Sequence, residues 1–262
     1  MTRANKIKAI TAANAALGKH YLTSPANADL EAVLAGEHLV YQEKHLISAS
    51  GFLQRSERMG TVIVSDQVKV PTQKRFIIAH ELGHWYLHQD IPFFNCMPEF
   101  FNQWNKKTAA IEQEANVFAA EFLMPTIPFM AFCQGKKFSK HLIIDLSEYF
   151  NVGIQAAAIR FANIGSEDIM IVKSTDRRVT WSCASDNFPW AFYDSKFRVP
   201  ESSITDEVFD GDNQDEKDEI EAREWFLKEH SDLTDLCLME EVIPMPQYGS
   251  CLTFLYQSEK NF

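Results

Sequence analysis

The sequence predicts an α+β protein in two parts, a domain of residues 1–165 and a smaller α+β extension of residues 166–262. Two observations lead to this prediction. Helix-like stretches dominate up to Gly165 and enclose a few short strand-like segments, whereas the alternation of apolar and polar residues that is typical of strands dominates after it. The length of 262 residues, 46% of them hydrophobic, is enough for one large core or two small ones.

In the first part, capping residues and prolines mark the ends of helices, and short β-branched runs bounded by Gly and Ser mark strands. The expected elements, in chain order, are a helix over residues 3–19, a second helix capped by Asn27 or Asp29 and ending near Gly36, two or three strands that include 38–46 and 60–66, a helix over 72–88, a helix over 108–125, and a helix pair over 141–165 joined at 151–153. Helices therefore outnumber strands in this part.

In the second part, strand-like segments alternate with turns and one helix. The expected elements are strands over residues 168–174, 178–185 and 250–258 and a helix over 219–230. Residues 206–221 hold nine acidic residues against one lysine, Lys217. Such a run of charge is typical of a solvated loop, and an acidic recognition surface is the less common alternative.

The charge balance disfavours nucleic acid as a partner. The chain has 25 Lys and Arg residues against 36 Asp and Glu residues, a net charge of -11, and a pI near 5.2, so it repels polyphosphates unless a local basic face intervenes. The helix pair over 141–165 could form a DNA-binding helix-turn-helix with Gln155 and Arg160 on its second helix. Basic residues are scarce there, which favours a structural helix pair.

The chain is expected in the cytoplasm, without membrane contact. Its five cysteines are odd in number, scattered and never in a CxxC pair, so neither a disulfide framework nor a thiolate zinc site is expected. The start of the chain is rich in alanine rather than leucine, and no other apolar run approaches the length of a membrane span.

The stretch "RFIIAHELGHWYLH", residues 75–88, contains an HExxH motif within one predicted helix. His80 and His84 are about 40° apart around the axis and roughly 6 Å apart along it, so both can reach one metal ion. Glu81 is about 100° from His80, which places it beside a metal-bound water as a general base. His88 lies roughly 12 Å along the axis from His80 and cannot share the ion, so a surface position or a contact with a ligand is expected.

A third protein ligand is expected from another element, because a catalytic zinc has three protein ligands and one open position. The predicted helix over 108–125 offers Glu112 and Glu114, which are about 200° apart, so only one can face the metal. Glu112 shares its face with Asn116, whose side chain can hydrogen-bond a ligand histidine. Glu112 is therefore the preferred ligand and Glu114 the fallback.

The motif "RFIIAHELGHWYLH" followed by "EQEANVFAAEFLMP" resembles the ImmA/IrrE family of metallopeptidases, and the resemblance covers about residues 51–165. It implies a minimal gluzincin-like fold in which two antiparallel helices hold zinc against a small sheet. It also implies ligands at His80, His84 and Glu112 and a base at Glu81. Related gluzincins often carry Asp where this chain has Asn116, and a neutral amide polarises a histidine less.

The resemblance also implies a function. Described members of the family cleave or inactivate a partner repressor of the helix-turn-helix type, often encoded nearby, during stress or mobile-element induction. The expected function is thus a zinc endopeptidase acting on such a repressor, with Mn²⁺ as the alternative metal because metal supply shares in that choice. A metal-containing regulatory protein that binds a partner without cleaving it is the alternative.

Three features concern the substrate. The strand containing Thr61, Val62, Ile63 and Val64 is the candidate sheet edge to which an extended peptide could add, although internal packing is the more common fate of such a strand. The aromatic loop over residues 93–104 could be a lid or a docking patch, although most of its rings are expected in the core. The donor that would stabilise the transition state is not identified by the sequence.

Overall fold

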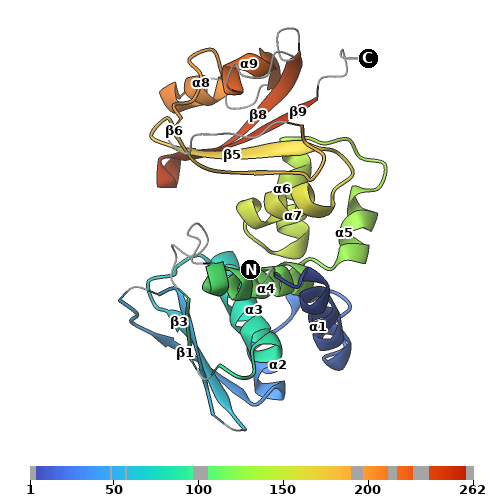
Figure 1. Ribbon diagram of the computed structural model, residues 1–262, viewed down its shortest axis with the longest axis vertical. Helices are drawn as coiled ribbons and strands as arrows, with labels where there is room; N and C mark the ends of the chain where they lie inside the picture. Colours follow the sequence, from blue (N-terminus) through green and yellow to red (C-terminus); the bar gives the residue numbers. More distant parts are fainter. Residues whose placement is uncertain are drawn as a thin grey trace. The chain divides into compact units, whose positions relative to one another are not determined.

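The computed structural model folds into two compact units, Met1–Phe129 with Ser147–Gly153, and Met130–Leu146 with Ile154–Phe262. The predicted α+β class is confirmed (Figure 1). The predicted division at residue 165 stays a prediction. The residues that the structure describes are 4–47, 49–56, 58–91, 93–96, 106–189, 197–211, 217–226 and 236–257, with the backbone alone at 93–96 and 106–109.

The first unit combines a four-stranded sheet with helices. Its elements are α1 (Lys6–Lys19), the short 3-10 helix η1 (Pro25–Asn27), α2 (Leu30–Gly36), β1 (Leu39–Lys44), β2 (Gly51–Arg55), β3 (Gly60–Ser65), α3 (Pro71–Leu87), β4 (Phe93–Cys96) and α4 (Lys106–Leu123). The helices α5 (Thr126–Cys133) and α6 (Lys140–Phe150) contribute residues to both units. Expected and observed helices agree closely up to α4, and three strands precede Pro71.

Local signals account for the helix ends. Of the two expected caps of α2, Asp29 is the one used, and its carboxylate accepts from the backbone N–H groups of Glu31 and Ala32. Proline at the first position of α3, Pro71, has a fixed φ that suits a helix start. The helix α3 therefore starts at a defined residue, which sets the positions of the histidines that follow.

The prediction that residues 61–64 form an exposed sheet edge is wrong. The strand order is β1-β3-β2-β4, so β3 pairs along its length with β1 in parallel and with β2 antiparallel. Val62 and Val64 are fully buried and Ile63 is 8% exposed. A strand that is apolar on both faces is typical of a sheet interior. Among the described strands, β1 and β4 are the edges of this sheet.

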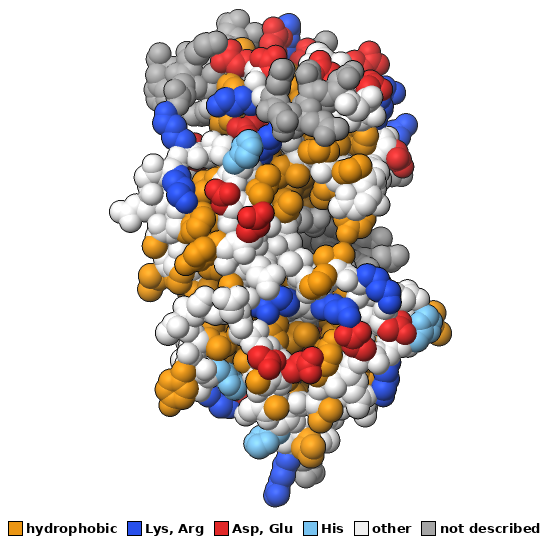
Figure 2. Space-filling model, turned by 180° about the vertical axis from the view of Figure 1, so that it is seen from behind, with side chains coloured by type: hydrophobic (Ala, Val, Ile, Leu, Met, Phe, Trp, Pro, Cys, Tyr) orange, Lys and Arg blue, Asp and Glu red, His pale blue; other side chains and the backbone are white. Residues whose placement is uncertain are grey.

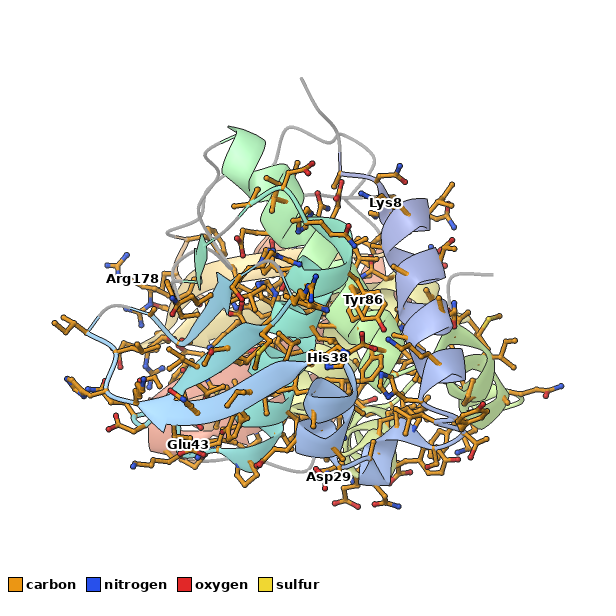
Figure 3. All side chains as sticks on the ribbon, turned by 90° about the horizontal axis from the view of Figure 1, so that it is seen from below. Lys8, Asp29, His38, Glu43, Tyr86 and Arg178 are labelled. Carbon is orange, nitrogen blue, oxygen red and sulfur yellow. The ribbon has the colours of Figure 1, made fainter. Side chains whose placement is uncertain are left out.

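Helix α3 lies between the sheet and the helices α1 and α4 (Figure 1). On the sheet side, Lys74 of α3 pairs with Glu43 of β1 at 2.7 Å. On the helix side, Lys8 of α1 donates to the carbonyl of Leu87 at 3.1 Å. Figure 3 labels Lys8 and Glu43, on opposite sides of this helix. The HExxH motif therefore lies in a well-covered helix, in which residues 77–84 and Leu87 are buried.

The second unit is built on a five-stranded antiparallel sheet with the order β6-β5-β9-β8-β7. Its remaining elements are α7 (Ile154–Ile164), β5 (Ile169–Thr175), β6 (Arg178–Ala184), α8 (Ile204–Asp210), β7 (Lys217–Glu221), α9 (Ala222–Trp225), β8 (Cys237–Met245), the 3-10 helix η4 (Pro246–Tyr248) and β9 (Ser250–Gln257). Neighbouring residues of β8 point to opposite faces of the sheet, so Glu240 and Glu241 bond to different helices. Glu240 accepts from the backbone of Thr205 in α8, and Glu241 accepts from the backbone of Lys140 in α6.

Two expectations for this unit are corrected. Residues 206–221 are not one loop, because 204–210 form α8 and 217–221 form β7, while 212–216 lie outside the described residues. Among the described strands of this sheet, β7 is an edge that buries Ile220 and leaves most of its charged residues exposed, as sheet edges commonly do. The helix expected over 219–230 does not start at 219, because residues 219–221 belong to β7 and pair with β8, and α9 begins at Ala222, while 227–230 lie outside the described residues.

Two further features concern partners other than proteins. On the face that Figure 2 shows, the described Lys and Arg side chains lie among Asp and Glu side chains rather than in one continuous basic surface. The expectation that nucleic acid is not a partner stays a prediction. No single helix among the described residues is long and apolar enough to cross a membrane, and one bent pair, Ala110–Leu123 with Thr126–Cys133, passes that test by length and composition.

Candidate metal centre

Three side chains from two helices converge in the first unit. His80 and His84 come from α3 and Glu112 from α4, and each offers an atom that lies within 4.8 Å of the others. The two histidine Nε2 atoms are 3.0 Å apart, and the Glu112 carboxylate lies 3.1 Å from His80 Nε2 and 3.5 Å from His84 Nε2. All three residues are buried. The structure thus brings together the three predicted ligands.

Each histidine has a partner at its other ring nitrogen. Asn116 Oδ1 lies 2.9 Å from His80 Nδ1, one turn along α4 from Glu112. His88 Nδ1 lies 3.0 Å from His84 Nδ1. A ring held at Nδ1 presents Nε2 in a defined direction, and such partners are common around metal-binding histidines. Both Nε2 atoms are therefore directed to the same point.

Glu81 is fully buried beside the centre, where it is packed against a glycine of the sheet. A Cβ atom at Gly51 would lie 2.5 Å from Glu81 Oε1 and 2.6 Å from Ile77 Cγ2, distances that real side chains essentially never show. Only glycine therefore lets β2 approach this carboxylate so closely. The spacing that assigns a role to Glu81 does not reveal that Gly51 is needed to accommodate it.

A second glycine sets the separation of the two helices. A Cβ atom at Gly83 would lie 3.1 Å from Phe118 Cβ and 3.2 Å from the backbone of Ala115. Ala115 and Ala119 are fully buried, so small residues line both sides of this crossing. Because Glu112 lies one turn before Ala115, the close approach at Gly83 is what brings its carboxylate to the histidines.

We expect Gly83→Ala to weaken both the fold and the metal site. The backbone of Ala115 can move only if α4 moves, and such overpacking costs about 1–3 kcal/mol, more than the roughly 0.5–1 kcal/mol that alanine contributes inside a helix. Urea unfolding of the metal-free protein and a competition assay for Zn²⁺ measure the two effects. Gly18→Ala is the matched control, because a Cβ atom at Gly18 in α1 meets nothing within 4 Å. This substitution should stabilise the protein. An equal stabilisation by both variants would contradict the packing argument.

The end of α3 is held by the sheet as well. Arg55 of β2 donates to the carbonyls of His84 and Trp85 at 3.2 and 2.9 Å, and its guanidinium stacks 4.0 Å from the Trp85 ring centre. The last carbonyls of a helix lack partners within it, and a cation there also complements the helix dipole. Arg55 therefore fixes the backbone of one of the converging histidines.

The charge states of the site suit metal binding. Burial acts to raise the pKa of Glu112, but the hydrogen bonds from His80 and His84 outweigh it and hold that pKa well below its usual range. Burial lowers the pKa of His84 to about 3. Burial also acts to lower the pKa of His80, but its hydrogen bond to Glu112 and the charges of Glu81 and Glu112 raise it above its usual value. Glu112 is therefore ionised and His84 neutral, and a metal ion at His80 would compete with a proton for the same ring nitrogen.

The donor set fits a tetrahedral metal site. Two imidazole nitrogens and one carboxylate are ligands that zinc accepts in catalytic sites. Two nitrogens bound tetrahedrally at about 2.05 Å would lie roughly 3.3 Å apart, close to the 3.0 Å between the Nε2 atoms of His80 and His84. The fallback residue Glu114 is directed elsewhere, with its carboxylate 3.1 Å from His88 Nε2.

Two other predicted features are His88 and the aromatic loop over residues 93–104. His88 is 8% exposed and reaches the centre through His84 rather than by facing solvent. In the aromatic loop, residues 97–104 lie outside the described residues, and only the backbone is described in β4. The spacing left both a surface position and a contact with a ligand open for His88, and the structure shows the contact with His84.

Comparison with known proteins agrees with this geometry. Residues 35–162 match the family model of peptidase M78 described as the IrrE N-terminal-like domain. The metallopeptidase ImmA of Bacillus subtilis (strain 168) is 29% identical over 127 residues, which are 45% of this chain. The match spans 66% of that protein, slightly less than two thirds of its length. The segment matched by the family model contains all three converging side chains.

A solved structure shares the fold. A transcriptional regulator of Mycobacterium tuberculosis superposes with a TM-score of 0.60 over 97% of this chain and 77% of its own. The sequence identity is 13%. At that identity the likeness concerns the fold alone.

Proposed function

Because residues 35–162 belong to the ImmA/IrrE family of metallopeptidases, we propose that this chain is a zinc-dependent endopeptidase that cleaves one specific protein partner. The observation that supports this proposal most is the convergence of His80, His84 and Glu112, with Glu81 buried next to them. The resemblance to family members suggests a repressor of the helix-turn-helix type as the partner, in a stress or mobile-element response.

Each side chain at the centre has a task in the proposed mechanism. Zinc held by the two histidines and Glu112 would lower the pKa of a bound water toward about 7 and polarise the scissile carbonyl. Glu81 takes a proton from the attacking water as the new C–O bond forms, and gives a proton to the amine as the C–N bond breaks. Asn116 and His88 hold the two imidazole rings, so the geometry is set before the substrate arrives.

The substrate is proposed to bind as an extended segment along β4. This strand is an edge among the described strands, and its register places Cys96 opposite Gly51 of β2. Gly51 in turn contacts Glu81, so a single strand separates this edge from the proposed base. Strand addition uses backbone hydrogen bonds and needs an extended, accessible segment in the partner.

The proposal is tested with the full chain and a lysate of its source cells. Purified protein loaded with Zn²⁺ is added to the lysate, and new protein N-termini are identified by mass spectrometry, with and without a zinc chelator. We expect close to one equivalent of bound metal and a few new N-termini, in one DNA-binding repressor, that the chelator suppresses. Bound partner protein without any chelator-sensitive cleavage would instead support a regulatory binding protein.

A further inference from the structure

A second carboxylate is linked to the metal centre through two imidazole rings. His84 Nδ1 lies 3.0 Å from His88 Nδ1, and His88 Nε2 lies 3.1 Å from Glu114 Oε2. The other oxygen of Glu114 accepts from the backbone N–H of Asn5 at 2.7 Å. His88 is 8% exposed and Glu114 has a side-chain exposure of 15%, so the chain of contacts is largely shielded from water.

His88 is the residue that ends α3, four residues after His84. Its backbone N–H still bonds to the carbonyl of His84, but its φ of -124° and ψ of 54° are no longer helical. Its ring lies beside the ring of His84, with centres 5.1 Å apart, as expected for side chains four residues apart at the end of a helix.

Hydrogen-bond chemistry gives this chain of contacts one direction. When His84 Nε2 binds a metal, its Nδ1 carries the ring's only proton and donates. His88 must then accept at Nδ1, which places its own proton on Nε2, where the carboxylate of Glu114 accepts it. The carboxylate of Glu114 thus selects the tautomer of both imidazole rings.

We propose that His88 and Glu114 are positioning residues that hold His84 in its metal-binding tautomer and orientation. This inference rests on the proposed function. Asn116 has the matching task for His80, but with a neutral amide. The two ligand histidines therefore have unequal support, and a carboxylate-backed imidazole is the more strongly polarised acceptor for His84. Asn5, the residue that caps α1, completes the chain by fixing Glu114.

Three variants and one spectroscopic measurement test this role. His88→Leu removes the acceptor and should weaken Zn²⁺ binding by about 10- to 100-fold in competition with a chromophoric chelator. His88→Asn places an amide oxygen near the position of Nδ1 and should regain most of the affinity. His141→Leu makes the same exchange at an exposed histidine of α6 and should change nothing. Thermal unfolding of each metal-free variant shows whether it is folded.

Nitrogen-15 NMR of the zinc-loaded wild type reads the tautomers directly, and it decides the question if His88→Leu does not fold. We expect protons on His84 Nδ1 and His88 Nε2 and none on His88 Nδ1. A proton on His88 Nδ1, wild-type affinity in His88→Leu, or equal losses in His88→Leu and His88→Asn would each overturn the inference while leaving the zinc site intact. A wild type that binds no Zn²⁺ would overturn the proposed function itself.

Discussion

Replacement of Glu81 by glutamine should abolish cleavage while leaving the metal in place. The amide keeps the size of the side chain, which is fully buried against Gly51, so the packing at this point is retained. It cannot take a proton from water, and loss of a general base typically costs about 100- to 10,000-fold in rate. The rate of appearance of the new N-termini, measured beside the metal content, gives both quantities for one protein.

The metal content of the Glu81→Gln protein separates loss of the base from a structural defect. A Glu81→Gln protein that has lost its metal would indicate a structural defect, and its inactivity would say nothing about the base. A metal-loaded Glu81→Gln protein that cleaves at the wild-type rate would show that the assigned mechanism is wrong. Retained partner binding without cleavage is the expected behaviour.

Replacement of Glu112 by glutamine should remove most of the affinity for Zn²⁺. Its carboxylate is the only acidic member of the described metal-binding group, and it lies 3.1 and 3.5 Å from the two histidine nitrogens. Without this negative charge the site would hold a dication with neutral ligands alone in a buried position. We expect at least about a 100-fold loss, larger than a change outside the ligands causes, measured by the same chelator competition.

Glu114→Gln is the matched comparison on the same helix. The amide oxygen can still accept from His88, so a loss of less than about tenfold is expected. If Glu114→Gln loses the metal and Glu112→Gln keeps it, the two assignments must be exchanged. The pair of variants therefore distinguishes a ligand from a positioning residue with one charge removed in each case.

Helical spacing was sufficient to predict how the converging side chains are arranged. Residues four apart share a face, which places His80 with His84 and Glu112 with Asn116. Residues two apart do not, which sends Glu114 toward His88 instead. These relations are local, so they follow from the chain wherever it forms a helix.

Strand pairing was not predictable in the same way. The run at 61–64 suits either an edge or an interior strand, and only its pairing with both β1 and β2 shows that it is interior. Likewise, β7 occupies an acidic segment that resembles a loop until its pairing with β8 is known. Hydrogen bonds between strands join residues that are distant in the sequence, and local pattern does not specify them.

Local pattern and helical spacing were therefore enough to predict the α+β class, the helices around the site and its three converging side chains. How closely those helices approach, and what lies behind each ring, is known only from the packing of the folded chain. Gly83 permits the approach of α4, Gly51 permits the burial of Glu81, and Glu114 of α4 lies behind the ring of His88. Spacing within a helix is set by backbone geometry over a few residues, whereas close packing depends on atoms contributed by elements that are distant in the sequence.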